Sequence, residues 1–255
     1  MIVLPRGIGP ALSCGITFLA KCMSMEKIVI FTGAGVSAES GLKTFRAMDG
    51  LWNDHAIEDV ATPEGWARNP ALVLDFYNQR RQEVLAAHPN AAHEAIARLE
   101  SMFDVTVITQ NIDDLHERAG SSKVLHVHGE ILKARSSIDP ELIHTLDTPT
   151  IAPGDRCAKG SQLRPDVVWF GEAVRFMDES ETLFANASRV LTIGTSLTVY
   201  PAAGLVKHAP YLAEKYLVSP DVQKVPYGFH FMRGLATTVV PHIVTCWMEG
   251  RSPVR

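Results

Sequence analysis

The chain has 255 residues, of which 46% are hydrophobic and 20% are charged. This length suits one large domain, or one domain with a small insertion, and the apolar share provides for a sizeable core. The net charge of −4 comes without a long basic run, which argues against nucleic-acid binding through a broad basic surface.

Cysteine is sparse, and no pair has the CxxC spacing of a metal or redox motif. The sequence therefore predicts no disulfide framework and a reducing, cytoplasmic setting. The four cysteines are Cys14, Cys22, Cys157 and Cys246.

Residues 1–24 are apolar but are interrupted by glycine and proline, so no unbroken stretch is long enough to span a bilayer. A signal peptide is one alternative, although no clear small-residue cleavage motif precedes the first expected strand. Because Met25 lies just ahead of that strand, we expect residues 1–24 to be a poorly ordered N-terminal extension. Residues 25–250 are then expected to form a single region, without a membrane partner.

A β-branched apolar run at residues 27–32 predicts a buried strand. Gly33 and Gly35 follow at once, ahead of helix-compatible residues from Ala38. Glycines there permit a tight turn and a close approach to a diphosphate, which the N–H groups of a helix start would favour. Glycines also end strands for structural reasons, so this pattern alone leaves dinucleotide binding and a plain turn equally open.

Further along the chain, helices are expected over residues 70–86, 91–101 and 178–187, and strands over residues 104–109, 123–126 and 189–193. Pro70 suits a first helical turn. An irregular stretch is expected to follow the strand at 123–126, and a strand–helix–strand–helix order closes the chain. Alternating strands and helices imply an α/β fold with a doubly wound parallel sheet, whose ligands bind where the strands end.

His126 ends the expected strand at 123–126 and His128 lies two residues further along, so on a strand both would face the same side. His126 and His128 could form a metal pair, but no third ligand stands at a familiar spacing. A structural role is the simpler interpretation for His126. His128 is followed by glycine, and its near-neutral pKa would let it accept a proton.

Five strings occur in the order found in sirtuins: GAGVSAESGLKTFR (33–46), TQNIDDLHERAG (109–120), VHGE (127–130), VVWFGE (167–172) and GTSLTVYPAA (194–203). The chain therefore resembles this family of NAD-dependent protein-lysine deacylases from about residue 25 to residue 241. The resemblance implies a Rossmann-like sheet with a small module drawn from about 36–88 and 130–165. It also implies NAD as cofactor, acylated-lysine proteins as substrates, and nicotinamide and O-acyl-ADP-ribose as products.

The resemblance assigns roles to individual residues. The acyl oxygen would attack C1′ of the nicotinamide ribose, and His128 would then take a proton from a ribose hydroxyl. Singly, each other residue could equally be a cap or turn residue. The implied NAD-binding residues are Gly33, Ala34, Gly35, Ser37, Thr44, Phe45, Arg46, Gln110, Asn111, Ile112, Asp113, Gly194, Thr195, Ser196 and Ala236, and the implied peptide-binding residues are Val168, Phe170 and Gly171.

Tyr77 and Arg80 are three residues apart on the expected helix at 70–86, so they share a face. This Y-x-x-R pattern resembles the sirtuins that remove succinyl and malonyl groups, and Ala61 matches the small residue that widens their acyl pocket. A guanidinium can hold a carboxylate with two hydrogen bonds, and a phenol adds a donor. The alternative is an ordinary amphipathic helix surface, and an acidic preference would not exclude acetyl groups.

The chain departs from the family where most sirtuins carry four zinc cysteines. Only Cys157 lies there, and Ser136 and Ser137 stand near the place of the first pair. A tetrahedral structural site needs four ligands, and the spacing of His144 and Asp155 gives no support. We therefore expect no zinc, and closure of the module by apolar contacts around Ile138, Leu142, Ile143 and Leu146.

Three further substitutions affect expected cofactor contacts. Lys43 replaces a proline, Ala47 replaces a glycine, and the segment 217–219 replaces an asparagine-containing turn near the adenosine ribose. Two alternatives to a deacylase stay open. A transferase would use the same site to pass ADP-ribose to a protein side chain, and the altered cofactor loop and adenosine turn suggest a noncatalytic NAD sensor.

Overall fold

The computed structural model describes residues 25–43, 51–52, 55–146 and 148–254. The predicted extension 1–24, the predicted cofactor residues Thr44, Phe45 and Arg46, and Ala47 lie outside the described residues. Within the described ranges, no helix is long and apolar enough to cross a membrane.

A six-stranded sheet forms the centre of the larger part, in the order β11-β10-β9-β1-β4-β5. All of its neighbouring strands are parallel, as predicted. The strands are β1 (Lys27–Thr32), β4 (Asp104–Thr109), β5 (Val124–His126), β9 (Arg189–Ile193), β10 (Glu214–Ser219) and β11 (His230–Arg233).

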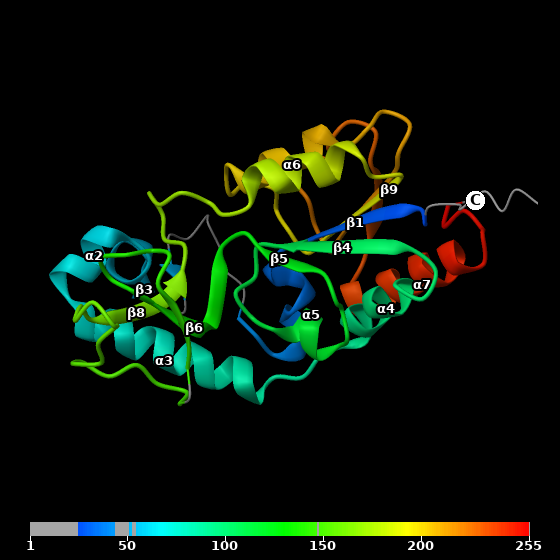
Figure 1. Ribbon diagram of the computed structural model, residues 1–255. Helices are drawn as coiled ribbons and strands as arrows, with labels where there is room; N and C mark the ends of the chain where they lie inside the picture. Colours follow the sequence, from blue (N-terminus) through cyan, green and yellow to red (C-terminus); the bar gives the residue numbers. More distant parts are fainter. Residues whose placement is uncertain (1–24, 44–50, 53–54, 147, 255) are drawn as a thin grey trace, which may run out of the picture.

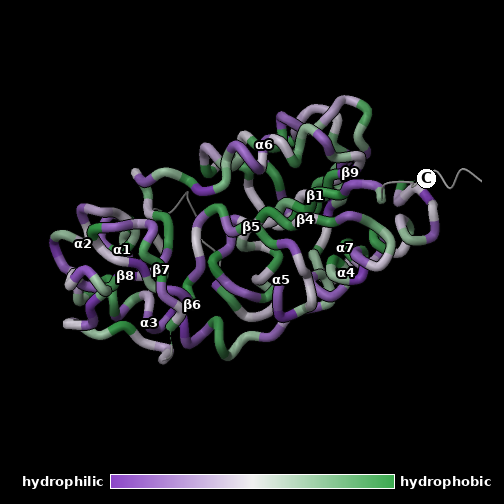
Figure 2. The backbone as a smooth tube through the Cα atoms, viewed as in Figure 1, coloured by the Kyte–Doolittle hydropathy of each residue, from purple (hydrophilic) through white to green (hydrophobic). Residues whose placement is uncertain are grey.

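Helices cover both faces of this sheet because its central strands are apolar on both sides (Figures 1 and 2). In β1, Ile28 and Ile30 pack with α4 (Ala91–Leu99) and α7 (Ala236–Met248). Val29 and Phe31 point to the other face, toward α6 (Met177–Ala185) and the 3-10 helix η3 (Ala202–His208). This alternation confirms the doubly wound arrangement.

A smaller module extends beyond one end of the sheet (Figure 1). It contains α1 (Ile57–Val60), α2 (Pro63–Arg68) and α3 (Pro70–Ala86). The last of these begins at Pro70, where Asn69 caps the first turn by accepting from the Leu72 N–H at 3.1 Å. Helix α3 thus matches its predicted bounds. A short antiparallel pair, β2 (Leu51–Trp52) with β3 (His55–Ala56), precedes these helices.

An antiparallel sheet, β7-β6-β8, completes the module, where the sequence predicted an irregular stretch. Its strands are β6 (Gly129–Ser136), β7 (Ile143–Thr145) and β8 (Leu163–Val167). That prediction was wrong because Arg135 and Arg164, which lie on paired strands, are buried around Glu172, so the strands lack an apolar alternation. The module boundaries expected from the sequence stay a prediction.

The apolar closure predicted for the module was also partly wrong. Ile138 and Ile143 are 67% and 42% exposed. The buried apolar contacts come instead from Leu74, Ala134 and Ile151, against which Leu146, Leu163 and Trp66 pack. Ile138 lies in the turn after β6, where its own N–H is held by the Ser136 hydroxyl at 3.2 Å.

Ser136, Cys157 and Ser161 lie together in the part of the module where the sequence predicted that no zinc would bind. Ser136 Oγ lies 2.9 Å from Ser161 Oγ, and Cys157 Sγ lies 3.1 Å from the same Ser161 oxygen. Hydrogen bonds with Ser136 and Ser161 lower the pKa of Cys157 to about 7. Among the described residues, no group of three or more His, Cys, Asp or Glu side chains could hold a metal. The absence of zinc stays a prediction.

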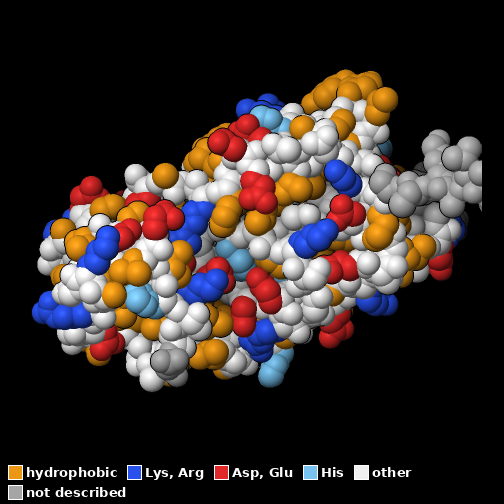
Figure 3. Space-filling view, viewed as in Figure 1, with side chains coloured by type: hydrophobic (Ala, Val, Ile, Leu, Met, Phe, Trp, Pro, Cys, Tyr) orange, Lys and Arg blue, Asp and Glu red, His pale blue; other side chains and the backbone are white. Residues whose placement is uncertain are grey.

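Charged side chains of both signs are mixed on the face of the molecule seen in Figure 3. Figure 3 shows acidic and basic side chains side by side over one face, without a broad patch of either sign.

Candidate active site

A cavity of about 430 Å³ lies between the carboxyl ends of the central strands and the small module. This volume is within the range of small-molecule sites. The turns after β1, β4 and β9 all reach it, as the parallel sheet predicted. Beside residues expected from the sequence, it is lined by Leu42, Lys43, Glu83, Val84, Ile131, Val167, Trp169, Glu172, Val174, Val199, Tyr200, Pro201, Ser219 and Asp221.

The glycine turns after β1 and β9 pack directly on each other. Gly35 N donates to Gly194 O at 2.8 Å, and a Cβ on Gly35 would lie 2.6 Å from Gly194 Cα. Gly194 itself has a φ of +62°, which favours glycine. These glycines therefore bring two strand ends together, and no side chain of theirs projects into the cavity.

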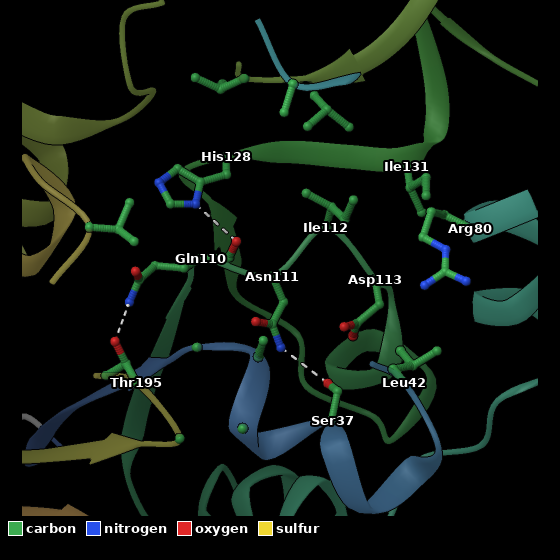
Figure 4. A pocket seen from close by; sticks show the side chains of 18 of the residues that line it. Ser37, Leu42, Arg80, Gln110, Asn111, Ile112, Asp113, His128, Ile131 and Thr195 are labelled. Carbon is green, nitrogen blue, oxygen red and sulfur yellow. Dashed lines mark hydrogen bonds between the residues drawn. The ribbon is translucent and has the colours of Figure 1, made fainter. Parts of the chain in front are cut away.

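Polar side chains after β4 are held in place by a buried network (Figure 4). Asn111 Nδ2 donates to Ser37 Oγ at 3.1 Å. The Asn111 N–H donates to Thr109 Oγ1 at 3.0 Å, and Thr109 in turn accepts from Thr32 Oγ1 at 2.8 Å. Residues at the ends of β1 and β4 thus help to fix Asn111, whose side-chain amide faces the cavity.

Asp113 presents a buried carboxyl group to the same cavity. Its Oδ1 accepts from the Leu115 N–H at 3.2 Å, at the start of α5 (Leu115–Arg118). Burial raises the pKa of Asp113, while hydrogen bonds from Leu115 and Ser37 oppose that shift. The site therefore offers an amide and a carboxyl group close together, which suits a carboxamide and ribose hydroxyls.

His128 is oriented by the backbone. Its Nδ1 lies 3.0 Å from Gln110 O (Figure 4). Because a carbonyl oxygen only accepts, Nδ1 carries the proton, and in the neutral ring Nε2 keeps its lone pair. Burial lowers the pKa of His128, so the neutral form prevails near pH 7. This is the tautomer and charge that a general base requires.

Gly129 follows His128 for a steric reason. Its φ is +81°, and a Cβ there would meet the Asp166 carbonyl oxygen on β8. The N–H of Val168, the residue after β8, donates to His128 O at 2.9 Å where the two segments cross. The glycine therefore lets β8 pass close to the histidine.

His126 has the structural role that the sequence suggested. Its ring lies between Asn111 O, 3.0 Å from Nδ1, and Glu117 Oε1, 2.7 Å from Nε2. Both partners accept, so both ring nitrogens donate and the ring is charged. Burial opposes that charge, but the hydrogen bond and the charge of Glu117 raise the pKa of His126. The pair fixes the backbone of Asn111.

The far end of the cavity is built by α3 and the segment after β8. Tyr77 is fully buried, its oxygen accepts from Trp169 Nε1 at 3.1 Å, and burial raises its pKa. Arg80 is 6% exposed and forms an ion pair with Glu83. Ala61 is buried beside them, and its carbonyl accepts from the Phe170 N–H at 2.9 Å.

Glu172 holds the segment that carries Trp169. It accepts from Arg135 at 2.6 Å and from Arg164 at 2.7 Å, and the Trp169 N–H donates to it at 2.8 Å. The Arg164 guanidinium also lies 3.1 Å from the centre of a Trp169 ring, within cation–π distance. This network positions the indole that holds Tyr77.

Most of the residues singled out from the sequence line this one cavity, although their individual roles stay predictions. Ala236 does not line it, because it is the first residue of α7 and is buried in the core. Leu217 is likewise buried in the core, whereas Ser219 reaches the cavity. Those that line it are Gly33, Ala34, Gly35, Ser37, Ala61, Tyr77, Arg80, Gln110, Asn111, Ile112, Asp113, His128, Val168, Phe170, Gly171, Gly194, Thr195 and Ser196.

Glu83 and Trp169 are lining residues that the analysis of the sequence did not assign. Trp169 lies within the VVWFGE string. A buried tryptophan usually donates its ring N–H to a hydrogen-bond acceptor, and this tendency could have indicated a contact with another side chain. Glu83 stands three residues after Arg80, a spacing that predicts contact on a helix.

Residues 33–201 match the Sir2 family. A relative described as an NAD-dependent protein deacylase, from Helicobacter pylori, is 54% identical over 199 residues, which cover 78% of this chain and 86% of the relative. Another of that description, from Bacteroides thetaiotaomicron, is 51% identical over 216 residues and covers 83% of this chain and 91% of the relative.

Solved structures show the same likeness. A Sir2 homologue–NAD complex is 38% identical, with a TM-score of 0.77 over 89% of this chain and 91% of that chain. A Sir2–p53 peptide–NAD⁺ complex is 26% identical, with a TM-score of 0.69 over 89% of this chain and 94% of that chain. The fold and cavity define a nucleotide-binding α/β enzyme. The chain belongs to the Sir2 family, which confirms the resemblance seen in the sequence.

Proposed function

We propose that this protein is an NAD-dependent protein-lysine deacylase in which His128 is the general base. The observation that carries the proposal is the orientation of His128, whose Nδ1 is held by Gln110 O while Nε2 remains a base within the cavity. The absence of side chains at Gly33, Gly35 and Gly194 would let a diphosphate approach the backbone closely, and Asn111 and Asp113 suit a nicotinamide ribose. These features fit NAD.

NAD, when bound, supplies the ribose carbon that takes the acyl oxygen, and nicotinamide leaves. The protein's residues bind and orient. Asn111 is held by Ser37, and Asp113 by the Leu115 N–H, so both side chains are in place before the cofactor arrives. His128 Nε2 would then remove a proton from a ribose hydroxyl, and the hydrogen bond from Nδ1 to the Gln110 carbonyl would stabilise the charge that forms on the ring.

The acylated lysine would enter beside the segment that follows β8. Phe170 is 44% exposed there, and Gly171 is exposed next to it. Both line the mouth of the cavity together with Val168. The acyl group would then extend toward Ala61 and α3, with protein substrates contacting the exposed rim.

The acyl preference is proposed to include succinyl and malonyl groups. Arg80 places a buried guanidinium at the acyl end, Tyr77 lies on the same helix face, and Ala61 leaves room. A buried carboxylate is unfavourable without a charged partner, so Arg80 would favour acidic acyl groups. Acetyl-lysine would remain a substrate because the rest of the cavity does not depend on the acyl charge.

A screen of acetyl-, malonyl- and succinyl-lysine peptides with and without NAD tests this function. Lysine release, with one nicotinamide per lysine, is expected only when NAD is present. An ADP-ribosylated protein without lysine release would favour the transferase, and NAD binding without turnover would favour the sensor.

A cytoplasmic setting without direct nucleic-acid or membrane partners is proposed as well. Cys157 and Cys246 are both buried free thiols, which agrees with a reducing compartment. Fractionation of cells that express the protein would test this location.

A further inference from the structure

Arg80 has an internal carboxylate partner inside the cavity. Glu83 lies one turn further along α3 and pairs with Arg80 Nη2, and both side chains line the cavity. The Arg80 side chain is 7% exposed, whereas that of Glu83 is 43% exposed. The guanidinium is therefore fixed in the interior, while the carboxylate that neutralises it can leave toward solvent.

Arg80 also keeps donor capacity for a ligand. Its Nε is buried without a hydrogen-bond partner among the described residues. Burial also lowers the pKa of the Arg80 guanidinium. Figure 4 shows the guanidinium reaching into the cavity on the side opposite His128, with Ile112 between them in this view. A carboxylate at the end of an acyl chain would therefore meet the same guanidinium that Glu83 now contacts.

We propose that Glu83 is a specificity-determining residue that competes with acidic acyl groups for Arg80. This inference rests on the proposed deacylase function and its acidic acyl preference. A succinyl group would replace the Glu83 carboxylate, which swings out to water, so one ion pair is exchanged for another. An acetyl group leaves the Arg80–Glu83 pair intact, so the buried cation stays neutralised. Glu83 thereby lets one cavity accept both acyl classes.

The neutral isostere Glu83→Gln isolates this competition. In that variant the ratio of kcat/KM for succinyl-lysine to kcat/KM for acetyl-lysine is expected to rise about five- to tenfold, mainly through KM for the succinyl peptide. A larger rise in this ratio is not expected, because Glu83 is partly exposed and water screens its attraction to Arg80. In an Arg80→Met background, Glu83→Gln should leave the ratio unchanged, because no cation remains to compete for.

Asp75→Asn is the matched control, because Asp75 is an exposed carboxylate on the same helix that bonds Gln79 and does not line the cavity. It should leave the ratio at the wild-type value. Melting temperatures of all variants show whether each one folds.

The outcomes separate the two proposals. If Arg80→Met lowers desuccinylation but Glu83→Gln leaves the ratio unchanged, the competition is wrong and the acidic preference stands. A rise of the same size in the Arg80→Met background also overturns the competition. If Arg80→Met does not affect desuccinylation, or if neither the wild type nor Glu83→Gln removes succinyl groups, the acidic preference and the inference both fail.

Discussion

Replacing Arg80 by methionine should reduce desuccinylation selectively. Arg80 is 6% exposed, so a succinyl carboxylate bound to it would be largely removed from water. A hydrogen bond to a charged group contributes roughly 1.5–3 kcal/mol, which corresponds to about 10- to 150-fold in kcat/KM. Methionine keeps much of the volume of the aliphatic stem, so we expect deacetylation to fall by less than about threefold.

The assay compares kcat/KM for succinyl- and acetyl-lysine forms of one peptide. Arg98→Met, which removes an exposed arginine on α4, is the control for the loss of one positive charge. An equal fall for both peptides in Arg80→Met, or no fall, would refute the assignment of Arg80 to the acyl end.

In Tyr77→Phe the effect on activity has to be separated from an effect on stability, because Trp169 Nε1 donates to the Tyr77 oxygen. Phenylalanine would leave that buried indole donor unpaired, at a cost of about 1–3 kcal/mol in the free energy of unfolding. The loss of desuccinylation should still be milder than in Arg80→Met, and urea unfolding measures the stability part separately.

The remaining predictions concern the fold and its titration. Protein purified without added metal should contain no stoichiometric zinc, and elemental analysis that finds one zinc per chain would contradict the absence of a metal site. Gly129→Ala should lower the free energy of unfolding by more than about 2 kcal/mol, because it adds a collision with β8 to the strain of a φ of +81°. Gly154→Ala is the control, because Gly154 has a φ of +98° with open space around it, so alanine there adds backbone strain without a collision. An equal loss of unfolding free energy in both variants would contradict the close contact between Gly129 and β8. Since the pKa of His126 is raised, the pair with Glu117 stabilises the fold fully below about pH 6.5 and loses its effect as pH rises through the raised value. The stability difference between the wild type and Glu117→Gln should therefore shrink with rising pH in urea titrations, and a constant difference would show that His126 is not charged.

The central sheet could be predicted from the sequence because its strands are locally distinct. β1, β4 and β9 are short β-branched runs that are buried on both faces, and each ends at the predicted residue. Helix α3 was bounded by Pro70 at its start. Helices α4 and α6 end two residues earlier than predicted, where the backbone hydrogen bonds change to a tighter turn.

The small module could not be predicted in the same way, because long-range polar contacts determine it. Arg135 and Arg164 look like surface residues of irregular chain, and only their shared partner Glu172 makes their burial possible. Ile138, which was expected to close the module, lies in an exposed turn, and Ile143 lies at the exposed start of β7.

The cavity was foreseen better than its internal contacts. Gly33, Asn111 and Gly194 follow strands that share one edge, so sheet topology brings them together. The role of Glu83 depends on how Arg80 is buried, which no local pattern shows. Ala236 does not reach the cavity because it begins α7 and is buried in the core.

His128→Ala gives the most direct test of the proposed function. The measurement is NAD-dependent release of lysine from an acylated peptide, with melting temperature and NAD binding recorded for the same preparation. General-base catalysis contributes about 10²- to 10⁴-fold, so kcat should fall by that factor while the protein still folds and binds NAD. Turnover equal to that of the wild type in the folded variant would contradict the assignment of His128 as the base.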